Sequence, residues 1–208
     1  MTRIVALLAI ALCACNNDAN VRSDSTSSDT VISDASSDTT TPDTITPANT
    51  QAPAANLLTP DGWGPVRIGM TRAEVVSAAG EDARPNAVGG PEPEQCDEFR
   101  PRNAPDGLLV MIERGVVTRI SVSRNPAIKT AEGFGVGDPA AAIIAAYGSR
   151  ARVDLHKYSD PPAKYITVWR GSPAQTDRRG IRYEIDATDR VAHVRGGAQS
   201  IEYVEGCL

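Results

Sequence analysis

The sequence has few of the side chains from which enzymes usually build an active site. Among 208 residues there are two histidines, His156 and His193, and four cysteines. There is no Gly-x-Ser-x-Gly turn, no His-Glu-x-x-His pair and no glycine loop for phosphates or dinucleotides. Asp154 lies close enough to His156 to share a metal, but no third ligand follows at a suitable spacing. We therefore expect no catalytic residue, no metal and no cofactor.

An excess of positive charge is also lacking. Residues 57–208 carry 19 Lys and Arg against 20 Asp and Glu, and the whole chain has a net charge of −5. A domain this close to neutral has no general attraction for phosphate backbones, which nucleic-acid binding requires. Nucleic acid is therefore not an expected partner.

Long hydrophobic runs are missing as well. The apolar run at residues 4–12, which follows Arg3, has nine residues. As a helix it would extend about 14 Å, less than half of a bilayer's hydrocarbon core. A run of this length near a basic start is typical of a secretory signal peptide, which we predict for residues 1–14.

The end of this segment, Leu12-Cys-Ala-Cys15, resembles the bacterial lipobox. In that motif a small residue precedes the cysteine that receives a diacylglycerol group, and Ala14 precedes Cys15. The resemblance implies that acylated Cys15 anchors the mature protein to a lipid bilayer in the cell envelope. Asn16 differs from the Asp that often retains lipoproteins at the inner membrane, so the outer membrane is favoured. A plain secretory signal is the alternative.

Residues 15–56 read as the lipidated cysteine followed by a disordered tether. Of the 41 residues in 16–56, 29 are Ser, Thr, Asn, Asp or Pro, and none is aromatic. Such a segment cannot offset the entropy lost on ordering. We expect residues 57–208 to form one globular domain held away from the lipid surface.

The globular part contains two similar helix signals, at residues 68–80 and 136–148. In the first, Thr71 and Glu74 predict a capping box for a helix near 71–79. In the second, Asp138 is expected to cap a helix near 138–147. A glycine ends each helix signal.

Each helix signal is followed by β-like sequence. Residues 107–122 and 180–194 predict hairpins, with turns near 113–115 and 186–189. Further strands are expected at 96–100 and 165–170, with a last one at 201–204. The predicted fold is therefore α+β. Two tandem repeats of a helix followed by antiparallel hairpins, about 57–128 and 129–208, form one curved sheet with short helices on one face. The alternative is that the two segments are unrelated and merely have glycines at similar positions.

The opening Ile68-Gly-Met-Thr-Arg-Ala-Glu-Val75, followed by hairpins in a lipoprotein, resembles the BamE/OmlA family of outer-membrane lipoproteins. In duplicated form it is similar to the β-lactamase inhibitor proteins. The ending Tyr203–Leu208 resembles that of uncharacterised proteobacterial lipoproteins. These resemblances imply a fold, and beyond Cys15 they carry no functional residue to this chain.

Cys96 and Cys207 are the two cysteines of the globular part. In an exported protein an even pair predicts a disulfide, which here would join the first repeat to the last strand. Two separate thiols are the alternative.

Four residues form a possible partner surface. Alternation along 165–169 places Tyr165 and Trp169 on one strand face, opposite the aliphatic residues between them. If the aliphatic residues face the helices, the two aromatics lie on an open sheet face near Arg182 and Glu184. Aromatic side chains flanked by charge suit protein recognition. The alternative is that both aromatics belong to the core.

The sequence therefore favours a non-catalytic envelope lipoprotein whose sheet face binds an unidentified envelope protein. An inhibitor of a periplasmic hydrolase is a sharper form of the same interpretation. The alternative of another class is an enzyme acting on cell-wall or small-molecule substrates, with the acidic cluster Glu92–Glu98 as its site. That cluster, which includes Asp97, is expected to be a solvated loop.

Overall fold

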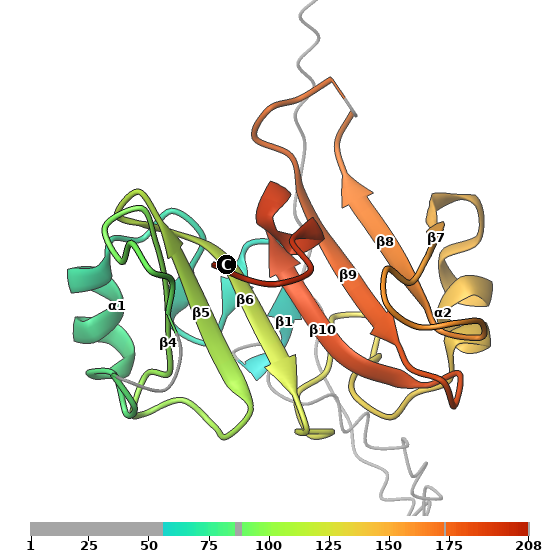
Figure 1. Cartoon of the computed structure of the whole chain (residues 1–208), viewed down its shortest axis with the longest axis horizontal. Coiled ribbons are helices and arrows are strands. Elements are labelled where there is room, and N and C mark those ends of the chain that lie inside the picture. Colours follow the sequence, from blue (N-terminus) through green and yellow to red (C-terminus); the bar gives the residue numbers. More distant parts are fainter. Residues whose placement is uncertain (1–55, 86–88, 173, 208) are drawn as a thin grey trace, which may run out of the picture. The chain divides into compact units, whose positions relative to one another are not determined.

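The computed structural model describes residues 56–85, 89–172 and 174–207 (Figure 1). Their fold is α+β, with two antiparallel sheets and few, short helices. The smaller sheet has the order β1-β2-β3 and the larger one the order β4-β5-β6-β10-β9-β8-β7. The strands are β1 (Leu58–Thr59), β2 (Gly62–Trp63), β3 (Val66–Arg67), β4 (Cys96–Phe99), β5 (Leu108–Glu113), β6 (Val116–Ser123), β7 (Arg152–Leu155), β8 (Lys164–Arg170), β9 (Arg179–Ile185) and β10 (Val191–Gly197).

The first predicted helix is confirmed as α1 (Arg72–Ala79). Thr71 caps it: the Thr71 side chain accepts from the Glu74 amide at 3.3 Å, and the Glu74 carboxylate accepts from the Thr71 amide at 2.7 Å. This is the expected capping box, in which two otherwise unpaired amides are satisfied reciprocally.

The second helix, α2 (Ala140–Tyr147), begins differently from the prediction. Pro139 is its N-cap residue and makes no side-chain cap, so the expected capping role of Asp138 is wrong. The Asp138 carboxylate accepts instead from the Gly135 amide at 2.7 Å and from the Lys129 ammonium at 2.8 Å. Asp138 lies one residue too early to cap the helix, and it fixes the preceding loop.

Both predicted hairpins are present. Arg114 and Gly115 connect β5 to β6 with φ values of 49° and 84°, the positive values that a two-residue hairpin turn requires. Between β9 and β10, the Asp186 carboxylate accepts from the Thr188 amide at 2.8 Å and so forms the turn through its side chain. The expected strands at 96–100 and 165–170 correspond to β4 and β8.

The end of the chain was predicted wrongly. Residues 201–204, expected to form a strand, belong to a 3-10 helix, η3 (Gln199–Glu202), and to the irregular segment after it. Arg119 of β6 donates to the carbonyls of Ser200 and Tyr203, at 3.1 and 3.2 Å. These carbonyls are therefore turned toward a side chain instead of a neighbouring strand. The small sheet β1–β3 and strand β7 were not anticipated.

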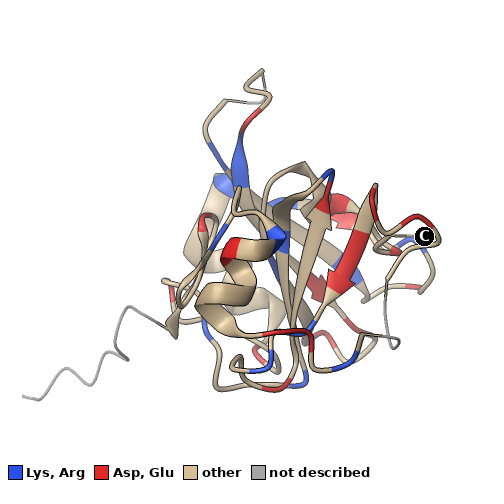
Figure 2. Ribbon diagram, turned by 90° about the vertical axis from the view of Figure 1, so that its left-hand side faces the viewer, with Lys and Arg blue, Asp and Glu red and all other residues tan. Residues whose placement is uncertain are grey.

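The apolar core lies on one face of the seven-stranded sheet, which we call the helix face. Both helices contribute to this core, through Val75 and Ala79 of α1 and Ala140, Ile143 and Tyr147 of α2. The sheet supplies aliphatic and aromatic side chains of alternate positions: Phe99, Leu108, Val110, Ile112, Val117, Ile120, Val122, Ile166, Val168, Ile181, Tyr183, Ile185, Val191 and Val194. The C-terminal segment lies on the opposite side of the sheet from α1, as the turned view in Figure 2 shows.

Candidate functional site on the charged face of the sheet

The face of the seven-stranded sheet opposite the helices carries polar and charged side chains from five strands. We call this set the charged face, and it consists of Glu98, Arg119, Tyr165, Thr167, Arg182, Glu184, His193 and Arg195. The strand register brings them together, because His193 lies opposite Glu184 and Arg195 lies opposite Arg182. Alternation along each strand points these side chains away from the core.

The chain returns over this face after β10. Residues 198–207, the C-terminal segment, run from η3 to β4, where Cys207 forms a disulfide with Cys96 at a Cα–Cα distance of 5.4 Å. This confirms the predicted pairing. Gly206 has φ of 71°, and a Cβ there would come within 2.8 Å of the Glu98 carboxylate. The positive φ at this position favours glycine over other residues.

Three arginines are buried beneath the C-terminal segment and are each matched with a carboxylate. Arg119 bonds Glu98, and Arg195 bonds Glu184 at 2.7 Å. Arg182 lies 3.9 Å from Glu202 of the C-terminal segment. The arginine side chains are only 4%, 9% and 6% exposed, in that order. Buried charges are tolerated only when they are paired in this way.

Burial and neighbouring charges shift several titrations here. Burial, reinforced by Arg195 and opposed by Glu98, lowers the pKa of Arg119 to about 10, so it stays charged at neutral pH. Burial also lowers the pKa of His193, against the attraction of Glu184. For Glu184, burial acts to raise the pKa, but Arg195 and His193 outweigh it and the net pKa is lowered. The face therefore contains an ionised carboxylate next to a neutral imidazole at neutral pH.

The expected partner surface needs correction, because two of its four residues are buried. Tyr165 is 2% exposed and Arg182 is 5% exposed. The Tyr165 ring has the Arg182 guanidinium 4.0 Å from its centre and is stacked on His156 at 4.7 Å. The aliphatic side chains of β8 do face the helices as predicted. The prediction missed that the loop after β7 and the C-terminal segment cover the opposite face.

The other two predicted surface residues are partly buried. Trp169 lies against Gly180, and the Arg178 guanidinium is 4.0 Å from its ring centre. Glu184 accepts from Arg195 and lies 3.5 Å from the His156 imidazole. The Glu184 carboxylate is therefore already held by Arg195, and Trp169 keeps only part of its surface exposed.

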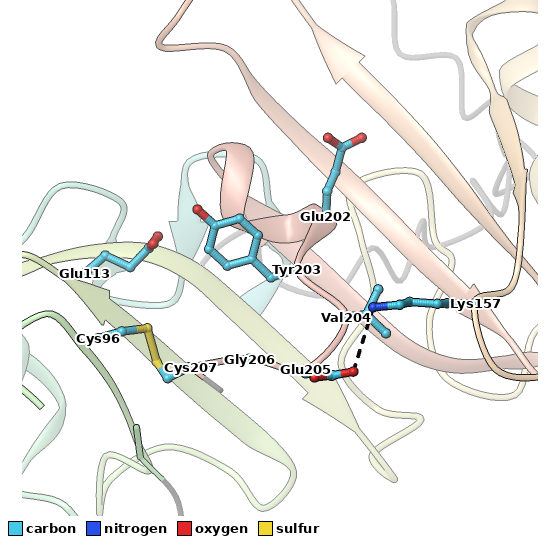
Figure 3. Close-up of a pocket in the computed structure, with 9 residues that line it drawn as sticks. All are labelled: Cys96, Glu113, Lys157, Glu202, Tyr203, Val204, Glu205, Gly206 and Cys207. Carbon is cyan, nitrogen blue, oxygen red and sulfur yellow. Dashed lines mark ion pairs between the residues drawn. A yellow bond between two sulfur atoms is a disulfide. The ribbon is translucent and has the colours of Figure 1, made fainter. Parts of the chain in front are cut away.

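A pocket of about 530 Å³ opens where the C-terminal segment meets the sheet (Figure 3). Its walls come from β4, β5, the loop after β7 and the C-terminal segment: Cys96, Glu113, Lys157, Glu202, Tyr203, Val204, Glu205, Gly206 and Cys207. We call it the C-terminal pocket. Its lining contains three glutamates and one lysine, so it is acidic. No local sequence pattern links these residues, since the pocket exists only because the chain end returns to β4.

Two groups in this pocket are well placed to meet a ligand. Tyr203 is 42% exposed, and burial together with Glu113 raises its pKa, so its hydroxyl stays protonated. The Glu205 side chain is 51% exposed and lies 3.8 Å from Lys157. An aromatic ring beside accessible carboxylates suits a cationic side chain.

The acidic cluster does not form the acid–base pair that the enzyme alternative required. Glu92 and Glu94 lie in an exposed loop, as expected. Asp97 and Glu98 are instead consecutive residues of β4 and point to opposite faces of the sheet. Asp97 bonds Arg72 beside α1, whereas Glu98 bonds Arg119 on the charged face. Both carboxylates therefore serve as partners of arginines.

The two histidines, 37 residues apart in sequence, both approach Glu184. Ser123 lies opposite His193 on β6, so a serine, a histidine and a carboxylate occupy one cross-strand row. In the part of the chain that the structure describes, no hydrogen bond joins Ser123 to His193, and Glu184 is held by Arg195. Within that part, no three His, Cys, Asp or Glu side chains converge in a way that could hold a metal ion.

The predicted lipidation site, Cys15, lies outside the described residues. None of the helices in 56–85, 89–172 and 174–207 is long and apolar enough to cross a membrane.

The chain matches no known family model and no curated protein. It is similar to the solved structure of a DUF4309 family protein (YjgB) from Bacillus subtilis, at a TM-score of 0.40 and 18% sequence identity. The similarity covers 67% of this chain and 85% of that chain. A likeness this low transfers neither fold nor function.

Proposed function

We propose that this chain is a lipid-anchored envelope protein whose globular domain binds another protein and catalyses no reaction. The observation that carries the proposal is the C-terminal pocket, an acidic pocket built by the chain end on the charged face of the sheet. Tyr165 and Arg182, which the sequence suggested as the binding surface, are buried. The proposed binding surface is instead the neighbouring C-terminal pocket.

The C-terminal pocket is held in shape by contacts with the sheet beneath it, so it is already formed before a partner binds. Arg119 holds the carbonyls of Ser200 and Tyr203, and the disulfide fixes Cys207 to the sheet. Pre-organised surfaces bind with a smaller entropy cost than flexible ones. The fixed C-terminal segment thus supports a binding role.

The charge of the pocket selects the chemistry of the partner. Glu113, Glu202 and Glu205 outnumber Lys157, and Glu202 is already shared with Arg152. Glu113 and Glu205 are the carboxylates with no arginine among their ion-pair partners in the described residues. A segment of a partner protein that carries lysine or arginine fits this lining, with Tyr203 as the aromatic contact.

Anchoring through acylated Cys15 would place the domain in the cell envelope, with the outer membrane favoured. The supporting feature is the Leu12-Cys-Ala-Cys15 sequence followed by a polar tether. Cys15→Ser is expected to release the protein from membranes or stall its processing, whereas Cys13→Ser should change little. An unacylated mature amino terminus in mass spectrometry would contradict the anchor.

The binding proposal is tested by photo-crosslinking in cells that express the full chain. A photoreactive amino acid at Tyr203 is expected to capture a discrete envelope protein. The same amino acid at exposed Thr188, in the β9–β10 turn, should capture none. If position 203 gives no adduct, or the same adducts as position 188, the pocket is not the binding surface.

The charge of the pocket is tested with a pair of matched variants. Glu205→Lys should abolish the adduct at position 203. Glu81→Lys, the same change at an exposed residue just after α1, should leave the adduct intact. Equal adducts from the two variants would rule out recognition of a basic segment. If the captured protein is a hydrolase and loses activity in the adduct, the inhibitor form of the proposal is favoured.

We further propose that the domain consists of two tandem units, about 57–128 and 129–208, related by duplication. The supporting pattern is chain order: α1 precedes β4, β5 and β6, and α2 precedes β7, β8, β9 and β10. Superposition of the two units in an experimental structure tests this. Failure of their helices and hairpins to overlay would refute the duplication.

A further inference from the structure

The strand at one end of the seven-stranded sheet, β7, has an open edge. It pairs with β8 on one side and is the last strand of the sheet on the other. In the described residues, no backbone hydrogen bond links residues 152–155 to anything outside that pairing. Its outer row of amides and carbonyls is therefore free to accept another strand.

Two of the four side chains of this edge strand are apolar and exposed to solvent. Leu155 is 80% exposed and Val153 is 48% exposed. They lie beside an apolar hollow of about 290 Å³, whose walls include Ile144 of α2 and Pro162. Edge strands are normally protected by charge, proline or a covering segment, and β7 carries charge on one face only, so its exposed apolar face favours a pairing surface.

The sequence of β7 is complementary to itself. In an antiparallel pair centred on Val153, Arg152 of each chain faces Asp154 of the other, and Val153 faces its own copy. Within one chain Arg152 bonds Asp154 at 2.9 Å and also bonds Glu202, so the pairing exchanges one Arg152–Asp154 ion pair in each chain for two between the chains. Arg152 and Asp154 point to the charged face, and Val153 and Leu155 point to the side of Ile166 and α2. Opposite charges thus meet on one face while apolar side chains meet on the other.

We propose that β7 pairs with β7 of a second copy about a two-fold axis at Val153, joining the two seven-stranded sheets. The charge pattern favours a second copy over an unrelated strand, because one short sequence supplies both halves of each ion pair. The axis makes the contact isologous, so the assembly closes as a dimer. This surface adjoins the C-terminal pocket through the Arg152–Glu202 ion pair, and the pairing goes beyond the binding role proposed above.

The test uses two charge-reversal variants of the full chain, studied in detergent by sedimentation equilibrium. The unmodified chain is expected to dimerise in a concentration-dependent way. Arg152→Asp places two acids opposite each other, and Asp154→Arg places two bases opposite each other. Each variant alone should dimerise about tenfold more weakly or worse. An equimolar mixture should recover the dimer, because the acidic strand of one variant then faces the basic strand of the other.

Other results would overturn the proposal. A chain that is monomeric at every concentration, single variants that dimerise as well as the unmodified chain, or a mixture that stays monomeric would each do so. Arg84→Asp, at an exposed residue far from β7 in the sequence, serves as the charge control and should not affect the dimer. Leu155→Arg alters no ion pair and should also weaken the dimer, so retention of the dimer in that variant would count against the proposal.

Discussion

The two faces of the seven-stranded sheet are both covered, but by different kinds of contact. On the helix face, aliphatic and aromatic side chains of the sheet pack against α1, α2 and the small sheet. On the charged face, the C-terminal segment lies over arginines that bond carboxylates and backbone carbonyls. Figure 1 shows η3 and the chain end in front of the strands that carry these arginines.

The two kinds of contact have different roles: one stabilises the fold, and the other fixes the position of the C-terminal segment. Apolar packing is non-directional and tolerates many arrangements, whereas ion pairs and hydrogen bonds fix a segment in one place. Arg119 illustrates the second role, because one guanidinium contacts both the C-terminal segment and Glu98 of β4. We infer that the helix face holds the fold together and the charged face holds the C-terminal pocket in shape.

The largest effect is expected from removing the covalent link between the charged face and the chain end. The disulfide spans 111 residues. Cys96→Ser combined with Cys207→Ser should lower the free energy of unfolding by about 4–5 kcal/mol in the chain-entropy view of disulfides. Urea denaturation measures this change. A loss below about 1 kcal/mol would mean that the noncovalent contacts alone order the chain end.

Truncation on the helix face should cost nearly as much. Phe99 has no exposed surface and lies in the apolar core. Phe99→Ala leaves a cavity there and should lower the free energy of unfolding by about 3–5 kcal/mol. Val116→Ala, at a side chain 37% exposed, is the control and should change it little. Equal effects from the two variants in urea denaturation would contradict the assignment of the core to this face.

Breaking an ion pair on the charged face should be costly, and removing both partners should not be. Arg119→Ala leaves Glu98 largely buried without its cation and should lower the free energy of unfolding by about 3 kcal/mol. Arg119→Met combined with Glu98→Met keeps the volume and removes both charges, so the part of this loss that comes from the unpaired Glu98 should be recovered, while the bonds to the Ser200 and Tyr203 carbonyls stay lost. If the double variant is as unstable as the single one, the pair contributes to stability directly and the division between the faces is wrong.

A smaller effect distinguishes the charged face by its dependence on pH. Burial lowers the pKa of His193 below its ordinary value of 6.5, so the folded chain resists a proton that the unfolded chain accepts. The free energy of unfolding should therefore fall as the pH drops from about 6.5 toward the lowered folded-state pKa. His193→Gln should flatten the pH profile in this range. An unchanged pH profile would show that burial does not lower the pKa of His193.

Sequence reasoning succeeded where the determining contacts are local. The Thr71–Glu74 capping box and the alternation of β8 were predicted because each depends on residues within a few positions. The predicted helix cap at Asp138 was wrong because the next residue, Pro139, occupies the N-cap position of α2. The disulfide was predicted from the even cysteine count and the expectation of export. Strand β7 alternates polar and apolar residues, but four residues are too few to separate a strand from a loop.

The covered state of the charged face could not be predicted in this way. Arg119 and the Ser200 carbonyl that it bonds are 81 residues apart. Alternation along the strands predicted which side chains share a face of the sheet. It did not predict that the chain end returns over this face and covers Tyr165 and Arg182. The C-terminal pocket was missed for the same reason.

The division of roles between the faces is tested most directly by hydrogen exchange in the Arg119→Met/Glu98→Met variant of the full chain. The amides of Ile201 and Tyr203, which are hydrogen-bonded within the C-terminal segment, report on that segment, and the amides of β5 report on the sheet. If the charged face positions the segment, exchange at the Ile201 and Tyr203 amides should become about tenfold faster or more while exchange in β5 stays unchanged. Unchanged protection of the segment, or equal loss of protection in the segment and β5, would contradict the account.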